Sequence, residues 1–326
     1  MSNADLQKIL SPIQAELQQV ETLVMANLET DIPLLTEVGQ YILKAGGKRV
    51  RPAMLLFAAG SLGEINQGCF EAANIIEYIH TATLLHDDVV DNADLRRSKQ
   101  SARSIWGNEA SVLVGDYLFT VSFRELAKLD RMELVHSLSR STTLMAKGEI
   151  LQLIRSNDSA TEADYLEIVL HKTATLMGCA MEMGALLAGG SPEQAADYYE
   201  IGKNIGMAFQ IIDDALDYRM DATDLGKDQG MDLKERKITL PLSHLLLVAD
   251  EAHQEQVLDV LDEEVITDEH VRQIAGLVEQ YKVVDYCLGR ADDYVKLAQK
   301  DLAKMPQNRF TESIGQLAGY VVRRDR

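Results

Sequence analysis

Long stretches of this chain contain no proline, and this feature restricts its fold more than any other. Prolines stand at positions 12, 33, 52, 192, 241 and 306, so residues 53–191 have none. Because proline interrupts α-helices, such stretches permit long helices. Apolar residues recur within them at i, i+3, i+4 and i+7, which is typical of helices with one buried face. Alternating strand patterns are hard to find, so the sequence predicts an all-α protein.

Glycine-rich stretches at 44–49, 187–193 and 224–232 indicate loops or helix boundaries. Ser191, followed by Pro192 and Gln194, has the pattern of a helix start. No low-complexity linker divides the chain, and we expect one domain over residues 1–326. The segments expected to be mainly helical are 1–45, 70–91, 109–129, 133–155, 162–188, 192–219, 237–250 and 269–304.

Charge and cysteine content exclude some classes of protein. The net charge of −19 argues against nucleic-acid binding through a basic surface. Cys69, Cys179 and Cys287 are far apart and odd in number, which fits neither a disulfide framework nor a metal cluster. The first ten residues, MSNADLQKIL, lack a signal-peptide pattern, and no apolar run is long enough for a transmembrane helix. We expect a cytoplasmic protein that is able to touch a membrane surface peripherally.

The stretch LLHDDVVDNADLRR, residues 84–97, carries an apolar helical pattern straight into carboxylates. Asp87 and Asp91 are four residues apart and share one helix face, whereas Asp88 points about 100° away. Burying an ionised carboxylate without a partner costs several kcal/mol, and carboxylates at a helix C-terminus also oppose the helix dipole. A bound divalent cation would explain this placement.

The stretch FQIIDDALDY, residues 209–218, repeats the pattern with Asp213 and Asp217 on one face and Asp214 beside them. A single DDxxD sequence is more often a solvated helix end, but two copies that each end an apolar helix favour a function. Oxygen ligands favour Mg²⁺ or Mn²⁺ over zinc. No calcium-binding EF-hand loop is present. Two acidic faces a substrate width apart suggest metal ions that hold a diphosphate between them.

Basic residues follow two glycines at 48–51, directly follow the first acidic stretch at 96–97, and are scattered through the second half of the chain. Any one of them alone would be ordinary surface charge, but near carboxylates that bind metal they suggest clamps for phosphate oxygens. A basic residue also precedes each acidic helix end by about 40 residues, which suggests two similar half-sites or a coincidence; the spacing does not decide. The basic residues in question are Lys48, Arg49, Arg51, Arg96, Arg97, Lys172, Lys227 and Lys237.

Six motifs occur in order over roughly residues 40–245 and resemble the trans-isoprenyl diphosphate synthase (polyprenyl synthetase) family. They are GGKRVRP, LLHDDVVD followed by RR, GEILQL, HKTATL, FQIIDDALDY, and GKDQGMD with KITLPL. The tail LAGYVVRRDR and the spacing are most similar to the bacterial octaprenyl members. One departure is Arg236, which stands where many members have glycine before the lysine that Lys237 matches.

The resemblance implies the isoprenoid synthase fold, about ten or more helices around a deep central cavity, as a homodimer. It implies Mg²⁺-dependent, sequential head-to-tail condensation of isopentenyl diphosphate onto an allylic diphosphate. Three Mg²⁺ ions are expected, with Mn²⁺ as a substitute, and no nucleic acid. The expected product is octaprenyl diphosphate made from farnesyl diphosphate, for quinone side chains such as that of ubiquinone.

The resemblance also assigns roles to residues by position. Metal ligands are expected at Asp87, Asp91 and Asp213, supported by Asp88, Asp214 and Asp217. The isopentenyl diphosphate site is expected at Lys48, Arg51, His80 and Arg97. Partners of the allylic diphosphate are expected at Arg96, Lys172, Lys227 and Lys237. Oxygens that face the developing carbocation are expected on Thr173, Gln210 and the backbone of Lys172.

Small residues beneath the first acidic motif bear on product length. Thr83 lies one turn below Asp87, and Ala82 flanks it. A bulky aromatic residue at this level stops the chain early in the family, so Ala82 and Thr83 predict a tunnel that continues. The alternative is that they only permit close helix packing. The glycines and alanines of 175–190 leave the same two alternatives open.

Three other functions remain possible at this point. A terpene cyclase shares the fold and one DDxxD motif but needs a single diphosphate site. A non-catalytic regulatory subunit of a prenyl synthase typically lacks an acidic motif, and both are intact here. A synthase of shorter farnesyl or geranylgeranyl products would share the whole site.

Overall fold

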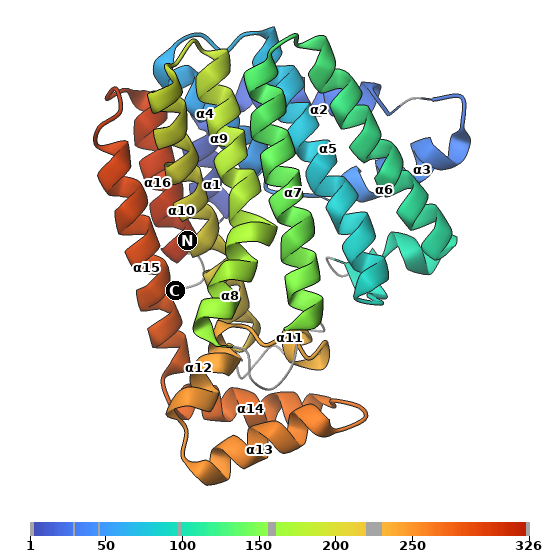
Figure 1. The fold of residues 1–326 in the computed structure, drawn as a ribbon, viewed down its shortest axis with the longest axis vertical. Coiled ribbons are helices and arrows are strands. Elements are labelled where there is room, and N and C mark those ends of the chain that lie inside the picture. The colour runs from blue at the N-terminus through green and yellow to red at the C-terminus, as the bar shows by residue number, and fades with distance from the viewer. Residues whose placement is uncertain are drawn as a thin grey trace.

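The computed structural model describes residues 3–28, 30–44, 46–96, 99–155, 161–219 and 230–323. Almost every described segment outside the loops is helical, which confirms the all-α prediction (Figure 1). The strands in the described ranges are β1 (Leu95–Arg96) and β2 (Lys99–Gln100), which pair antiparallel just after the first acidic motif. No helix of the described part is long and apolar enough to cross a membrane.

The N-terminal region, expected to be mainly helical over 1–45, is a series of short helices in the described residues. It consists of α1 (Asn3–Leu10), the 3₁₀ turn η1 (Ser11–Ile13), α2 (Gln14–Ala26) and α3 (Pro33–Lys44). Pro12 lies in the 3₁₀ turn and Pro33 begins α3, so the breaks coincide with the prolines.

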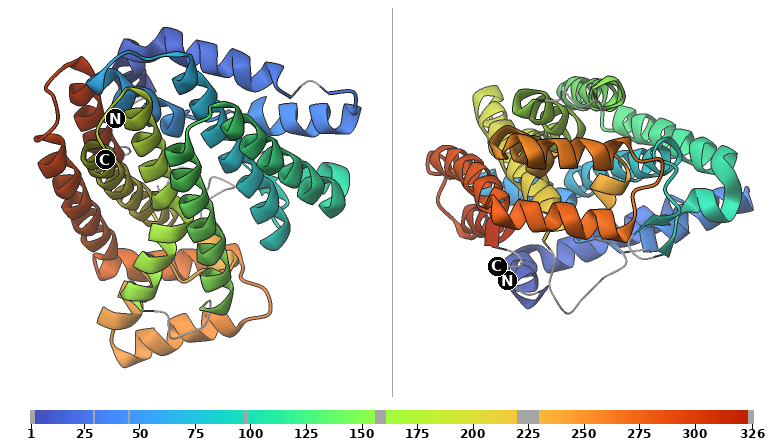
Figure 2. Two further views of the ribbon diagram at one scale, coloured as in Figure 1. Left: turned by 45° about the horizontal axis from the view of Figure 1, so that its top comes forward. Right: turned by 90° about the horizontal axis from the view of Figure 1, so that it is seen from below.

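The middle of the chain forms the main bundle. Its elements are α4 (Val50–Leu62), α5 (Gln67–Val90), α6 (Ala102–Lys128), α7 (Met132–Ile154), α8 (Glu162–Val169), the π-helical turn η2 (Leu170–Ala174), α9 (Thr175–Leu187) and α10 (Pro192–Asp217). α9 lies at the centre and packs against α4, α5, α7 and α10 (Figures 1 and 2). The helix start predicted at Ser191 is confirmed by a full capping box with Gln194.

Glycines on α9 let its neighbours approach very closely. A Cβ atom built on Gly184 would lie 2.2 Å from the carbonyl oxygen of Leu55 on α4. A Cβ atom on Gly178 would lie 2.9 Å from the ring and the backbone oxygen of Tyr199 on α10. Of the two alternatives for residues 175–190, the glycines therefore serve to seat neighbouring helices.

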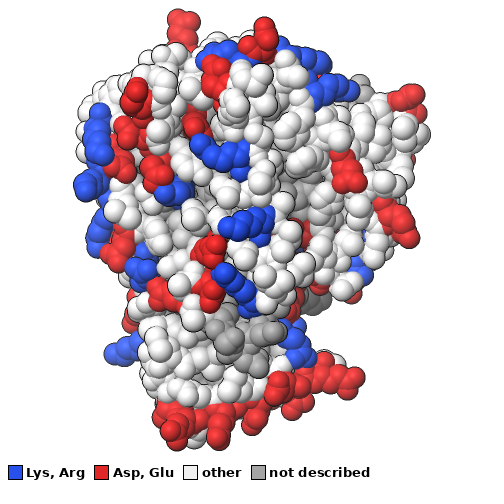
Figure 3. All heavy atoms as spheres, in the orientation of Figure 1, with Lys and Arg blue, Asp and Glu red and all other residues white. Residues whose placement is uncertain are grey.

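The C-terminal region adds α11 (Met231–Lys234), α12 (Leu240–Val248), α13 (Glu251–Asp262), α14 (Asp268–Gln280), α15 (Val283–Leu302) and α16 (Arg309–Arg323). The α13–α14 hairpin projects from one end of the bundle (Figures 1 and 2). Its outer edge is acidic (Figure 3), since Glu251, Glu255 and Asp259 are exposed on one face of α13.

The helices of the C-terminal region refine what was expected of it. The segment 269–304, expected to be mainly helical, consists of two helices, because Lys282 takes a left-handed φ of 54° between α14 and α15. α4 was not predicted as a helix: residues 52–61 are buried all round, so the segment has no polar face to reveal a period. α16 was also not predicted, although its apolar residues do follow the helical period.

Candidate active site

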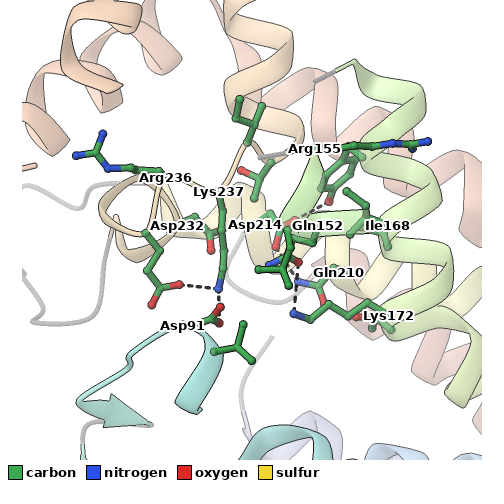
Figure 4. Close-up of a pocket in the computed structure, with 18 residues that line it drawn as sticks. Asp91, Gln152, Arg155, Ile168, Lys172, Gln210, Asp214, Asp232, Arg236 and Lys237 are labelled. Atoms are coloured by element: carbon green, nitrogen blue, oxygen red, sulfur yellow. Dashed lines mark hydrogen bonds and ion pairs between the residues drawn. The ribbon is translucent and has the colours of Figure 1, made fainter. Parts of the chain in front are cut away.

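The two acidic helix ends meet at one pocket. α5 ends at Val90 and α10 at Asp217, and a pocket of about 350 Å³ lies between these ends, α8, η2 and residues 235–239. Asp91 lines it from the first motif and Asp214 from the second (Figure 4). The structure therefore brings the two DDxxD stretches to a shared site.

Lysines from the second half of the chain neutralise the first acidic motif. Lys237 Nζ lies 2.7 Å from Asp91 Oδ2, and Lys172 Nζ lies 3.9 Å from Asp87 Oδ2. Both carboxylates are more than four-fifths buried. Burial raises the pKa of Asp87, and the nearby Lys172 and Arg96 oppose that rise. Each aspartate thus already faces a cation.

The two lysines also contact side chains outside the first acidic motif. Lys237 Nζ lies 2.6 Å from Glu235, and Lys172 donates to Glu149 at 2.8 Å and to Gln152 at 3.3 Å. Although burial alone would lower it, Asp91 and Glu235 raise the pKa of Lys237. Ion pairs with Glu149 and Glu235 therefore hold both lysines at the pocket wall.

Asp88 and Arg96 pair with each other and are absent from the lining of the pocket. Asp88 is fully buried, and Arg96 Nε donates to its Oδ1 at 2.5 Å. Burial raises the pKa of Asp88, while Arg96 opposes the rise. This pair ties the loop after α5 to the helix end. The role expected for Arg96 at the allylic diphosphate would require it to leave Asp88.

The second acidic motif is arranged differently from the first. Asp214 is buried and accepts hydrogen bonds from Tyr165 at 2.6 Å and from Gln210 at 2.7 Å. Thr173 in turn donates to Gln210 Oε1 at 3.0 Å. Burial raises the pKa of Asp214 to about 7, although the two donors oppose the rise.

Asp217 and Asp213 complete the second motif. Asp217 accepts backbone hydrogen bonds from residues 230–232, so it anchors the chain where it re-enters the described part. Asp213 is partly exposed on α10, one residue before Asp214. Asp213 thus retains more access to solvent than Asp214.

Of the residues expected to bind isopentenyl diphosphate, Lys48, Arg51 and His80 are not part of this pocket lining. Arg51 Nη1 and His80 Nε2 are 3.1 Å apart, so these two are brought together. Lys48 is exposed, with its Nζ 5.9 Å from the ring centroid of Tyr320 on α16. Arg97 and Lys227 lie outside the described residues.

Ala82 and Thr83, the expected determinants of product length, are on α5 below Asp87. Ala82 is fully buried. Thr83 is half-buried, and its hydroxyl donates to the carbonyl of His80 at 2.8 Å. Neither residue is part of the lining of the pocket described above.

Sequence reasoning missed several residues of the pocket. Glu149 and Gln152 belong to the GEILQL stretch, and Asp232 to GKDQGMD; both stretches were identified as motifs without a role for these residues. Tyr165 lies in no motif, and only the fold brings it to Asp214. The missed residues around the pocket are Glu149, Gln152, Tyr165, Asp232 and Glu235.

Lys172 and Thr173 lie in the π-helical turn η2. Such turns are rare and are frequently found at functional sites. α8, η2 and α9 follow one another without a break, and Tyr165, Ile168, Lys172 and Thr173 line the pocket together. The extra residue in the turn is not visible in a hydrophobic pattern, so sequence reasoning could not find it.

The donor set fits a magnesium ion that arrives with its substrate. Within the described ranges, no three His, Cys, Asp or Glu side chains are close enough to enclose a metal ion by themselves. Mg²⁺ typically uses one or two carboxylates and takes its other ligands from water and phosphate oxygens. Asp87 and Asp91 offer carboxylates that already attract cationic groups, which is the chemistry that such an ion requires.

Asp214 should make the stability of the metal-free protein depend on pH. Its pKa is about 7 in the folded protein, against 3.8 for an unperturbed aspartate, so between these values the folded state binds more protons. The free energy of unfolding should therefore fall as pH rises through this range, by at most about 4 kcal/mol from this group. Asp214→Asn should flatten part of this slope, measured by urea denaturation in chelator.

The matched control for this measurement is Asp259→Asn, which changes an exposed aspartate on α13. It should keep the slope of the unmodified protein. Equal slopes in the Asp214 variant and the unmodified protein would contradict the prediction.

Arg236 should carry backbone strain at the edge of the pocket. Its φ is 56°, the left-handed region, and its side chain points away from the pocket (Figure 4). The guanidinium donates to the carbonyls of Leu261, Glu263 and Glu264 at the end of α13. Arg236→Ala and Arg236→Gly both lose these contacts, but only glycine relieves the strain, so the glycine variant should be about 1 kcal/mol more stable.

Arg272, in the middle of α14, provides the control for this pair of variants. There the order should reverse, with alanine about 1 kcal/mol more stable than glycine, because glycine is unfavourable within a helix. Chemical denaturation of all four variants checks both signs. The same order at both positions would contradict a strained Arg236.

Comparison with known proteins agrees with this geometry. The family model described as "Polyprenyl synthetase" matches residues 32–278. Octaprenyl diphosphate synthase of Haemophilus influenzae is 36% identical, over 100% of this chain and 98% of that protein. All-trans-nonaprenyl-diphosphate synthase (geranyl-diphosphate specific) of Rhodobacter capsulatus is 37% identical, over 94% of each chain. The structure of a Caulobacter crescentus polyprenyl synthase complexed with calcium and isoprenyl diphosphate matches with a TM-score of 0.93 and 36% identity, over 98% of each chain.

Proposed function

Because this chain belongs to the polyprenyl synthetase family, we propose that it builds long trans-polyprenyl diphosphates by adding isopentenyl diphosphate repeatedly to an allylic diphosphate. The chain is a prenyltransferase, and its relatives include synthases of octaprenyl and nonaprenyl products. The observation that carries the proposal is the pocket between the two DDxxD helix ends, with lysines at its wall.

Asp87, Asp91 and Asp213 are the proposed ligands of three Mg²⁺ ions, which Mn²⁺ is able to replace. When bound, such ions neutralise the charge that develops on a departing diphosphate. Asp88 and Asp217 contribute through the groups they hold, Arg96 and the backbone after residue 229. Binding of the ions accordingly depends on the conformation of the chain at the C-terminal ends of α5 and α10.

Lys172 and Lys237 are proposed to exchange partners when substrate arrives. In the free protein they contact Asp87 and Asp91. With Asp87 and Asp91 holding a cation, Lys172 and Lys237 would be able to pair with diphosphate oxygens instead. Each buried charge keeps a counter-charge throughout, so the exchange avoids the penalty of an unpaired buried ion. The lysines then stabilise negative charge on the diphosphate as it leaves.

The oxygens of Thr173 and Gln210 are proposed to face the cationic carbon that remains. Both residues line the pocket, on η2 and α10. Water must be excluded from this carbon, since it would convert the cation to an alcohol. The double bond of isopentenyl diphosphate attacks the cationic carbon, and the product then loses a proton. No side chain is assigned as base, and the departing diphosphate is proposed to accept the proton.

The second substrate is proposed to bind at Lys48, Arg51, His80 and Arg97, with Arg96 and Lys227 completing the allylic site. This assignment is supported by the family resemblance and by the contact of Arg51 with His80. Arginine and lysine at these positions suit the oxygens of a diphosphate group.

The proposed setting is a cytoplasmic homodimer whose chains each act as one domain over residues 1–326. Val112 and Leu113 are exposed on α6 after its kink at Gly107, which supports an interface between two copies. The proposed substrates are farnesyl diphosphate as primer and isopentenyl diphosphate, and the product is octaprenyl diphosphate for the side chain of a quinone such as ubiquinone. Release of so apolar a product is proposed to involve peripheral contact with a membrane.

The experiment that tests this function uses the purified chain with farnesyl diphosphate, labelled isopentenyl diphosphate and Mg²⁺. Mass analysis should find labelled polyprenyl diphosphates, with octaprenyl as the main product, and a chelator should abolish them. If no product carries label, the proposal is contradicted. A terpene cyclase or a non-catalytic subunit would give that result. Products that end at farnesyl or geranylgeranyl length would contradict only the long chain.

A further inference from the structure

A chain of hydrogen bonds connects α8 to the pocket through a buried carboxylate. The hydroxyl of Tyr165 donates to Asp214 Oδ2 at 2.6 Å. The amide of Gln210 donates to Asp214 Oδ1 at 2.7 Å, and the hydroxyl of Thr173 donates to Gln210 Oε1 at 3.0 Å. Tyr165 and Asp214 are both buried, at 4% and 6% exposure.

The directions of these hydrogen bonds follow from the side-chain amide of Gln210. Its NH₂ group only donates and faces Asp214 Oδ1, so its carbonyl oxygen lies on the other side. The carbonyl oxygen of Gln210 is then turned toward Thr173, whose only hydroxyl hydrogen it accepts. Every donated hydrogen in this chain of hydrogen bonds therefore points toward Asp214. Lone pairs on the oxygens of Thr173 and Gln210 remain available to a group in the pocket.

We propose that Tyr165 and Asp214 are positioning residues that fix the side-chain amide of Gln210 with its oxygen toward the pocket. The inference deepens the proposed function and rests on it, because it takes Gln210 as a group that faces the cationic carbon. A flipped amide would present N–H groups to that carbon and would repel it. Tyr165 matters because it occupies the second oxygen of Asp214 and so fixes the rotation of the carboxylate.

Tyr165→Phe tests the proposal with the loss of one hydroxyl. We expect kcat to fall about tenfold, while KM for both diphosphates stays within about twofold, since the amide acts on charge that exists only after ionisation. Tyr286→Phe is the matched control, because the Tyr286 hydroxyl donates at 2.5 Å to Glu162, also on α8. It should leave kcat within about twofold.

A double-mutant cycle separates positioning from a general structural effect. If Tyr165 acts through Gln210, Tyr165→Phe should change kcat less than about twofold when Gln210 is already alanine. Additive effects in the double variant would overturn the inference. A wild-type kcat for Gln210→Ala would also overturn it, because the amide that Tyr165 positions would then have no role in the reaction.

Ligand binding provides a measurement that does not depend on turnover. Two unreactive analogues of farnesyl diphosphate serve as probes. One has a protonated amine nitrogen in place of C3, so its hydrocarbon part carries a positive charge. In the other, sulfur replaces the oxygen that joins C1 to the diphosphate, so its hydrocarbon part is neutral. Tyr165→Phe should weaken binding of the cationic analogue about tenfold and leave the neutral one unchanged. Equal weakening of both would overturn the inference.

These outcomes separate the inference from the function on which it rests. A wild-type chain that incorporates no isopentenyl diphosphate would contradict both. An active wild type whose Tyr165 and Gln210 effects add would contradict the inference alone. Circular dichroism of each variant before the assays establishes that the compared proteins are folded.

Discussion

Replacement of Asp87 by alanine is expected to lower the rate of prenyl transfer by roughly 10³-fold while the protein stays folded. The loss corresponds to about 4 kcal/mol of transition-state stabilisation, which is the size expected for a metal ligand. The fold should survive because burial already disfavours the charge of Asp87, as its raised pKa indicates. Steady-state rates at saturating substrate and circular dichroism measure the two effects.

The magnesium dependence of the same variant identifies the cause. Fewer ligands for the ion should shift the activating Mg²⁺ concentration upward, and Asp259→Ala, on exposed α13, should shift neither rate nor concentration. A rate within about tenfold of the wild type at excess Mg²⁺ would contradict the role given to Asp87. Lys172 also contacts Asp87, so the variant frees that lysine as well.

An aromatic residue below the first acidic motif is expected to shorten the product. Thr83 lies four residues before Asp87 on α5, about 6 Å along the helix, so a growing chain anchored at Asp87 would pass it. Thr83→Tyr should shift the products from octaprenyl toward fifteen or twenty carbons without abolishing turnover. Ala82→Tyr should do the same, with a loss of stability of about 1–3 kcal/mol because Ala82 is fully buried.

Chromatography of the products measures the chain lengths directly. Thr22→Tyr is the matched control, since the exposed Thr22 on α2 donates to a backbone carbonyl of the preceding turn, as Thr83 does. It should leave product length unchanged. Full-length products from both α5 variants would mean that the hydrocarbon tail takes another route through the protein.

The sequence predicted those parts of the site that are local in the chain. Each DDxxD stretch ends a helix, and that could be read from residue spacing, as could the helix start at Ser191. That the two stretches share one pocket was inferred from their repetition, and the structure agrees. Local pattern and charge were sufficient there because each feature lies within a few turns of one helix.

Features that depend on contacts between distant residues could not be predicted in this way. Tyr165 and Asp214 are 49 residues apart and belong to no common motif, so only the packing of α8 on α10 joins them. The pairing of Asp88 with Arg96, which turns one expected ligand away from the pocket, depends on rotation about the helix axis. Helix α4 escaped notice because a helix buried on all sides carries no amphipathic pattern.

A substitution at Gly184, outside the active site, would lower the amount of folded enzyme in a cell. Any side chain there would collide with the backbone of Leu55, which cannot move aside without separating α9 from α4. A missense change in codon 184 should therefore leave little folded protein, and growth at lower temperature or extra chaperone could restore some. Neither treatment would help a cell whose Asp87 is altered, so the two kinds of genetic lesion would be distinguishable without purifying the protein.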